Sequence, residues 1–124
     1  LPIFILVAED DDSNFKLIKA IIGKKCDIQW AKNGEEIVAL FKEYGKEAKA
    51  ILMDIKMPVM NGLDATKIIR EENKEIPIIM QTAYAFSSDK ENAMNAGASE
   101  VLVKPITLSI LRGTLTKYFP ELVW

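Results

Sequence analysis

The chain has 124 residues, of which 49% are hydrophobic and 27% are charged, and its net charge at pH 7 is −2. This length fits one domain, which we place at residues 1–124. No apolar run approaches the roughly 20 residues that span a membrane, and the basic residues form no stripe, so the pattern argues against membrane insertion and direct nucleic-acid binding.

The cysteine and histidine content narrows the chemistry further. Cys26 is the only cysteine, and the chain starts without a signal-peptide pattern, so we expect a reducing, cytoplasmic setting. We interpret Cys26 as a small buried apolar residue. The absence of histidine excludes the commonest general base, the Ser-His and Cys-His nucleophile pairs and most transition-metal sites.

The beginning of the chain predicts a strand, a helix and a second strand. The apolar run at residues 3–8 is followed at once by acidic residues, which is typical of a strand buried on both faces of a parallel sheet. Asp12 or Ser13 is expected to cap the following helix, whose apolar residues recur at near-helical spacing. A short second strand covers residues 27–31.

The middle of the chain repeats this alternation. Asn33 and Gly34 break the chain before a second helix, and the apolar run at residues 50–53 predicts a third strand that stops at Asp54. A third helix is expected to begin at residues 61–62, where Asn is followed by Gly.

The last part of the chain predicts two more strands and the remaining helices. Residues 77–80 form a fourth strand ending near Thr82, and residues 101–103 form a fifth ending at Lys104. The last helix runs from about residue 107 to 118. An apolar tail follows, which we expect to pack back onto this helix; the alternative is a contact with a neighbouring domain or chain.

Five strands alternating with five helices predict an α/β domain, with a parallel sheet covered by helices on both faces. In such sheets, ligands bind beyond the carboxyl ends of the strands. The residues found at those ends are polar or charged: Glu9, Asp10, Asp54, Thr82 and Lys104.

These strand ends predict a cation site. Two carboxylates about 4 Å apart repel by about 4 kcal/mol at an effective dielectric of about 20, so Glu9, Asp10 and Asp54 in one pocket need a cation between them. Oxygen ligands without nearby histidine or cysteine favour Mg²⁺, with the backbone carbonyl of Lys56 as a further ligand. Alternatively, the acids at residues 9–12 only complement a helix dipole, and Asp12 fits a cap better than a ligand.

The same strand ends predict phosphoryl chemistry. Lys104 supplies a fixed positive charge that pairs with Asp54 at rest and with a phosphoryl oxygen afterwards, and Thr82 is placed to bond another such oxygen. Together, Asp54, Lys104 and Thr82 indicate that Asp54 is a carboxylate nucleophile that forms an aspartyl phosphate. The alternatives are a solvated lysine and a simple strand-end threonine.

Four short motifs in the right order resemble response-regulator receiver domains. They are LVAED at residues 6–10, LMDIKMPVMNG at 52–62, TA at 82–83 and VKP at 103–105. The resemblance spans about residues 3–118, taken as the core, and leaves 119–124 as a C-terminal tail. The sequence around Asp54 and the stretch from Thr82 to Ala98 are most similar to receiver domains fused to hybrid sensor histidine kinases.

The resemblance implies a flavodoxin-like, doubly wound (βα)5 fold with sheet order 2-1-3-4-5. It implies that Asp54 is phosphorylated from a histidine kinase or histidine phosphotransfer protein. Mg²⁺ would be bound by Asp10, Asp54 and the Lys56 carbonyl, with Glu9 acting mainly through water. Thr82 would be the switch threonine and Lys104 the phosphoryl-contacting lysine.

The resemblance also bears on output and location. The face built from the fourth helix, fifth strand and fifth helix would contact a downstream protein or fused domain. The chain would be cytoplasmic, alone or within a membrane-anchored hybrid kinase, and would turn over no separate substrate. Many receivers carry an aromatic residue where Val101 stands, which puts the usual aromatic switch in doubt.

Lys56 and Tyr84 each lie two residues beyond a site residue, and we expect their bulk to screen the acyl phosphate from water and make self-hydrolysis slow.

Three alternative functions compete with that of a receiver domain: a phosphohydrolase of the haloacid-dehalogenase type, a binding module that signals without phosphate, and a flavin carrier. A phosphohydrolase of that type would carry its nucleophile after the first strand, whereas here the predicted nucleophile follows the third. A binding module that signals without phosphate usually lacks an acid or the lysine, and this chain has them all. A flavin carrier would need glycines and hydrogen-bond donors for a phosphate after the first strand, where this chain is acidic.

Overall fold

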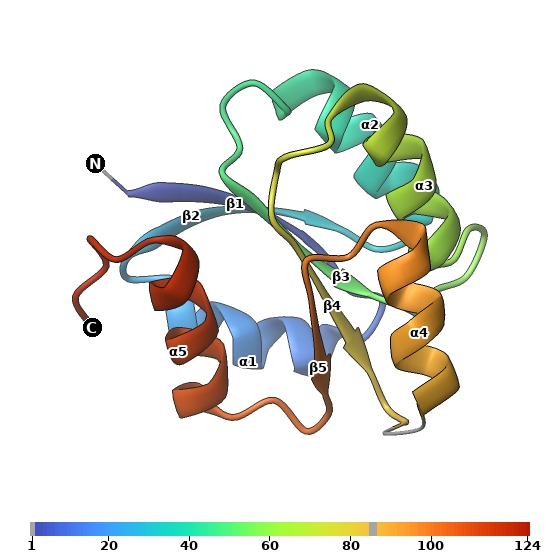
Figure 1. Ribbon diagram of the computed structural model, residues 1–124. Helices are drawn as coiled ribbons and strands as arrows, with labels where there is room; N and C mark the ends of the chain where they lie inside the picture. Colours follow the sequence, from blue (N-terminus) through green and yellow to red (C-terminus); the bar gives the residue numbers. More distant parts are fainter. Residues whose placement is uncertain (1, 85–86) are drawn as a thin grey trace.

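The computed structural model describes residues 2–84 and 87–124. Within them a parallel sheet has the strand order β2-β1-β3-β4-β5, as predicted (Figure 1). The strands are β1 (Ile3–Ala8), β2 (Cys26–Ala31), β3 (Ala50–Asp54), β4 (Ile78–Thr82) and β5 (Glu100–Val103). The helices are α1 (Asp12–Ile22), α2 (Gly34–Tyr44), α3 (Gly62–Glu72), α4 (Ser87–Ala96) and α5 (Leu108–Tyr118).

The helices form a layer on each face of the sheet. Helices α1 and α5 cover one face, and α2, α3 and α4 cover the other (Figure 1). Side chains of β1 alternate between the two layers: Ile5 and Val7 pack toward α1 and α5, whereas Leu6 and Ala8 pack toward α2 and α3. Burial on both faces explains why this strand is a continuous apolar run.

The first helix begins one residue from where the sequence places its cap. Asp11, not Asp12 or Ser13, is the N-cap, and its Oδ1 accepts a 3.0 Å hydrogen bond from the backbone N–H of Asn14. Asp11 has an extended backbone, whereas Asp12 is already helical. In a run of four acids the composition cannot distinguish these positions, but only the extended residue can aim its carboxylate at the free N–H groups.

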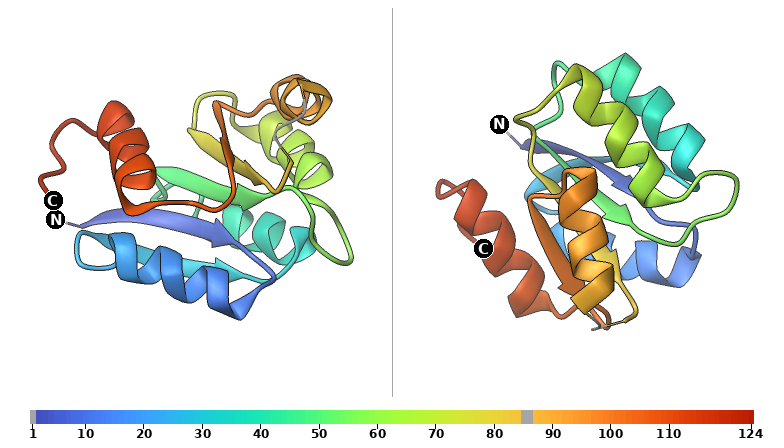
Figure 2. Two further views of the ribbon diagram at one scale, coloured as in Figure 1. Left: turned by 90° about the horizontal axis from the view of Figure 1, so that it is seen from below. Right: turned by 45° about the vertical axis from the view of Figure 1, so that its right-hand side comes forward.

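The two ends of the chain lie side by side (Figure 2), where Pro2, Ile3, Leu122 and Val123 line one cavity. The tail packs back onto α5, as expected: Leu122 is buried, and the indole N–H of Trp124 donates to Thr116 Oγ1 at 3.0 Å. Val123 is the exception, because its side chain is exposed.

One further sequence expectation concerns Cys26. Cys26 is buried at the start of β2, as its interpretation as an apolar residue requires. None of the helices described has the length and apolarity needed to cross a bilayer.

Candidate functional site at the carboxyl ends of the strands

The carboxyl ends of β1, β3, β4 and β5 surround a cavity of about 230 Å³. Its lining includes every residue that the sequence predicts for the cation and phosphoryl site: Glu9, Asp10, Asp54, Lys56, Thr82 and Lys104. Asp11, Asn14, Ile55 and Ala83 complete the lining. The parallel topology thus brings together side chains that lie far apart in the sequence.

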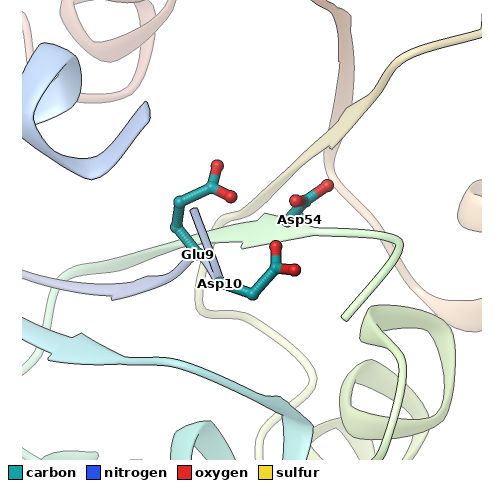
Figure 3. A group of neighbouring side chains, drawn as sticks. All are labelled: Glu9, Asp10 and Asp54. Atoms are coloured by element: carbon teal, nitrogen blue, oxygen red, sulfur yellow. The ribbon is translucent and has the colours of Figure 1, made fainter. Parts of the chain in front are cut away.

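Three carboxyl groups meet in this cavity. Oxygen atoms of Glu9, Asp10 and Asp54 lie within 4.8 Å of one another, with the carboxyl groups around a common space (Figure 3). Glu9 and Asp54 are buried, whereas Asp10 is exposed. Carboxylates this close repel one another strongly unless a cation or a proton intervenes.

Glu9 carries the clearest electrostatic signature of the site. Its Oε2 accepts the backbone N–H of Asp11 at 3.2 Å, whereas its Oε1 is buried without a hydrogen bond from any described residue. Burial raises the pKa of Glu9 to about 7, reinforced by the charge of Asp54 and opposed by Lys104 and the Asp11 N–H. In the absence of a metal ion the side chain therefore titrates near neutral pH instead of near its ordinary pKa of 4.5.

Lys104 faces the acids from the end of β5. Its Nζ donates to Asp54 Oδ2 at 3.0 Å and lies 3.5 Å from Glu9 Oε1. Burial favours the neutral amine, but the hydrogen bond and charge of Asp54, together with Glu9, outweigh it and raise the pKa of Lys104. The backbone N–H of Lys104 also donates to the carbonyl of Thr82 at 2.8 Å, which fixes its position beside β4.

A glycine allows the chain to turn tightly behind Asp54. The Gly62 N–H donates to the carbonyl of Ile55 at 2.7 Å, and a Cβ at Gly62 would lie 2.1 Å from the carbonyl oxygen of Asp54. Only a residue without a side chain fits there, so Gly62 helps to set the position of the Asp54 main chain. Ile55 is held in turn by a 3.0 Å bond to the carbonyl of Gln81.

Thr82 and Lys56 line the cavity, and Tyr84, the second predicted screening residue, contacts both of them. Thr82 is buried, and its Oγ1 accepts the backbone N–H of Tyr84 at 3.1 Å. Lys56 Nζ lies 4.4 Å from the centroid of the Tyr84 ring, a cation–π distance. Tyr84 does not line the cavity itself but reaches its rim through Lys56.

The donor set fits a hard divalent cation. Three carboxylates offer oxygen ligands. The buried Oε1 of Glu9 has the ammonium group of Lys104 at 3.5 Å but no hydrogen bond from a described residue, and a metal ion or a bound water would satisfy it. Lys56 borders the same cavity, and its carbonyl remains a predicted ligand. The residues present therefore suit Mg²⁺.

Sequence reasoning missed Trp30 of β2, whose indole N–H donates to the backbone carbonyl of Glu9 at 2.7 Å. A tryptophan in a short edge strand carries no local signal of such a role, because the contact joins residues 21 positions apart.

Val101 is partly buried and packs against the core on the α2–α4 face, in the place where an aromatic switch residue would stand.

A doubly wound parallel sheet with clustered acids and an opposing lysine at its strand ends defines a signalling domain of the two-component class. The chain belongs to the response regulator receiver domain family, whose sequence model matches residues 5–116. It is thus a receiver domain with a place in a phosphorelay.

Individual relatives agree with this assignment. Hybrid signal transduction histidine kinase I of Dictyostelium discoideum is 40% identical over 133 residues, covering 98% of this chain, which spans only 8% of that kinase. The yeast (Saccharomyces cerevisiae) complex of the histidine phosphotransfer protein Ypd1 with the Ssk1 receiver domain matches at a TM-score of 0.88 and 29% identity, covering 98% of this chain and 93% of the matched one. The CheX-CheY-BeF3-Mg complex from Borrelia burgdorferi matches at a TM-score of 0.90 and 25% identity, covering 96% and 90%.

Proposed function

We propose that Asp54 is the phosphoacceptor of this receiver domain. The observation that carries the proposal is the arrangement of Asp54 itself, with carboxylate oxygens of Glu9 and Asp10 within 4.8 Å and Lys104 Nζ at 3.0 Å. A carboxylate surrounded by cation ligands and an ammonium group is equipped to attack an electrophile that carries several negative charges.

The donor is a phosphohistidine of a histidine kinase or a histidine phosphotransfer protein. A carboxylate oxygen of Asp54 forms the new O–P bond while the N–P bond to the imidazole breaks, and the imidazole leaves with the electron pair and takes up a proton. Lys104 releases Asp54 and contacts a phosphoryl oxygen, and Thr82 donates its hydroxyl to another.

Glu9, Asp10, Asp54 and the Lys56 carbonyl would hold Mg²⁺, with Glu9 acting mainly through a water. When bound, Mg²⁺ neutralises part of the charge on the transferring phosphoryl group. The donor set described above supports this, as does the Borrelia neighbour, whose complex includes BeF3 and Mg.

Similarity to a hybrid kinase and to a receiver bound to a phosphotransfer protein supports a protein phosphodonor.

The phosphorylated domain would signal through the face of α4, β5 and α5 to a downstream protein or a fused domain. The side chains of Met94 on α4 and Val103 on β5 are exposed and would offer apolar contacts. With Val101 in place of an aromatic residue, rearrangement of α4 and its flanking loops would carry the switch. We place the chain in the cytoplasm, alone or within a membrane-anchored hybrid kinase.

We infer that the domain turns over no separate substrate and loses its phosphate slowly. The test is incubation with acetyl phosphate and Mg²⁺, followed by intact mass. One added phosphoryl group that is absent in Asp54→Asn supports the proposal. Steady release of phosphate without a lasting adduct would support a phosphohydrolase instead, and no adduct at all would support a module that signals without phosphate.

A further inference from the structure

Trp30 connects the edge strand β2 to the acid cluster. Its indole N–H donates to the backbone carbonyl of Glu9 at 2.7 Å, and the backbone N–H of Glu9 donates to the carbonyl of Ala31 at 2.9 Å. Both polar groups of the Glu9 main chain are therefore held by β2, just beyond Ala8 and Ala31, the last paired residues of the two strands.

This hydrogen bond acts directly on the approach to Asp10. The carbonyl of Glu9 and the nitrogen of Asp10 belong to one planar peptide unit, so fixing the carbonyl fixes the direction in which the chain enters Asp10. Asp10 is exposed, and packing alone constrains it little. Yet its carboxylate must turn toward those of Glu9 and Asp54 for the three to meet within 4.8 Å (Figure 3).

The indole is itself held in place before any ligand binds. The ring of Phe15 on α1 stacks on it, with 3.9 Å between centroids and an interplanar angle of 2°. Lys32 Nζ lies 4.7 Å from the indole centroid and pairs with Asp12 at 3.7 Å. A donor that is already oriented loses little further freedom when the site assembles.

We propose that Trp30 is a positioning residue of the cation site, which holds the Glu9–Asp10 peptide so that the carboxylates converge on one ion. The inference rests on the proposed function, because it concerns the affinity of that site for Mg²⁺. Sites of this kind bind weakly when the segment carrying a ligand is free to rotate.

The test compares Mg²⁺ affinity by calorimetry in the wild type, Trp30→Phe and Trp124→Phe. Trp30→Phe keeps an aromatic ring that can stack on Phe15 but removes the N–H donor. Trp124→Phe is the matched control, because it removes the hydrogen bond that the Trp124 indole in the tail donates to Thr116 of α5, outside the cation site. Loss of one hydrogen bond should weaken Mg²⁺ binding by about fivefold to tenfold in Trp30→Phe and leave the control unchanged.

A second variant changes a single group. The chain has two tryptophans, so in the Trp124→Phe background only Trp30 is replaced when tryptophan is substituted by 3-benzothienylalanine, which puts sulfur in place of the N–H. The same loss of affinity is expected. In Trp124→Phe with its natural indole, Trp30 fluorescence should change with Mg²⁺ and give the Kd found by calorimetry.

The outcomes separate the inference from the proposed function. A merely structural role for Trp30 would lower the melting temperature of the metal-free protein and leave the Mg²⁺ Kd of the folded protein unchanged, which would overturn the inference alone. Absence of Mg²⁺ binding in the wild type would overturn the magnesium site and this inference together. If Trp30→Phe does not fold, the benzothienylalanine protein decides.

Discussion

Lys104 Nζ lies 3.0 Å from Asp54 Oδ2, although the two residues are 50 positions apart in the chain. The same ammonium group is 3.5 Å from Glu9 Oε1, so one cation faces two buried acids. Since a phosphoryl group on Asp54 would add negative charge at this point, Lys104 is placed to stabilise both the resting and the phosphorylated state.

Replacing Lys104 with methionine should slow phosphorylation. A charge-assisted hydrogen bond contributes about 1.5–3 kcal/mol, so the rate of adduct formation from acetyl phosphate should fall by about tenfold to a hundredfold. The time course of intact mass measures this rate. Lys117→Met is the control, because Lys117 pairs with Glu100 away from the cavity; an equal effect of the two substitutions would contradict the role of Lys104.

Without divalent cations, stability should depend on pH through Glu9. Folding raises the pKa of Glu9 from 4.5 to about 7, because the buried side chain is better accommodated as the neutral acid. The stabilisation this gives is fully present below pH 4.5 and is lost as the pH rises through 7, a change of about 3 kcal/mol. Urea unfolding in chelator across this range measures it.

Glu9→Gln should flatten this part of the stability profile, because glutamine stays neutral at every pH in the range. Glu36→Gln is a useful control, since Glu36 is an exposed acid that bonds the backbone N–H of Lys32. An unchanged profile in Glu9→Gln would show that another group is responsible.

A pair of glycine substitutions tests how tightly the chain turns behind Asp54, the proposed phosphoacceptor. Gly62→Ala places a methyl group against the Asp54 carbonyl and should destabilise the fold by about 1–3 kcal/mol. Gly113→Ala in α5 meets nothing within 4 Å and should stabilise by about 0.5–1 kcal/mol. Denaturant midpoints measure both; a Gly62→Ala protein as stable as the wild type would contradict the packing described.

The screening residues can be tested through phosphate loss. We propose that the bulk and mutual contact of Lys56 and Tyr84 restrict the path of water, so removing both side chains should speed the decay of the phosphorylated protein several-fold. Decay of the adduct followed by intact mass gives the rate. Lys117→Ala with Tyr118→Ala removes a second cation–π pair outside the cavity and should have no such effect; an unchanged decay in the Lys56 and Tyr84 double variant would exclude screening.

The strands that position the site are predictable from the sequence because burial on both faces makes them continuous apolar runs ending in charge. The sequence of helix α4 carries no comparable pattern, so the bounds of this helix cannot be predicted from it. Its buried apolar residues include only small ones, Ala93 and Ala96, so little hydrophobic periodicity marks it.

The site residues were predictable because strand ends converge, but their electrostatics were not. The pKa of Glu9 depends on its complete burial and on the distance to Asp54, neither of which the sequence contains. The bond from Trp30 likewise depends on a side chain reaching across from a neighbouring strand. The N-cap at Asp11 could not be predicted from the sequence, because four consecutive acids are equivalent candidates for that position.

The most direct test of the account is to locate the phosphoryl group. Borohydride converts an acyl phosphate on aspartate into homoserine, so peptide mass spectrometry after phosphorylation with Mg²⁺ and reduction identifies the residue modified. The account predicts homoserine at position 54 and at no other acid. Homoserine at Glu9's neighbour Asp10 or at another aspartate, or none at all, would contradict it.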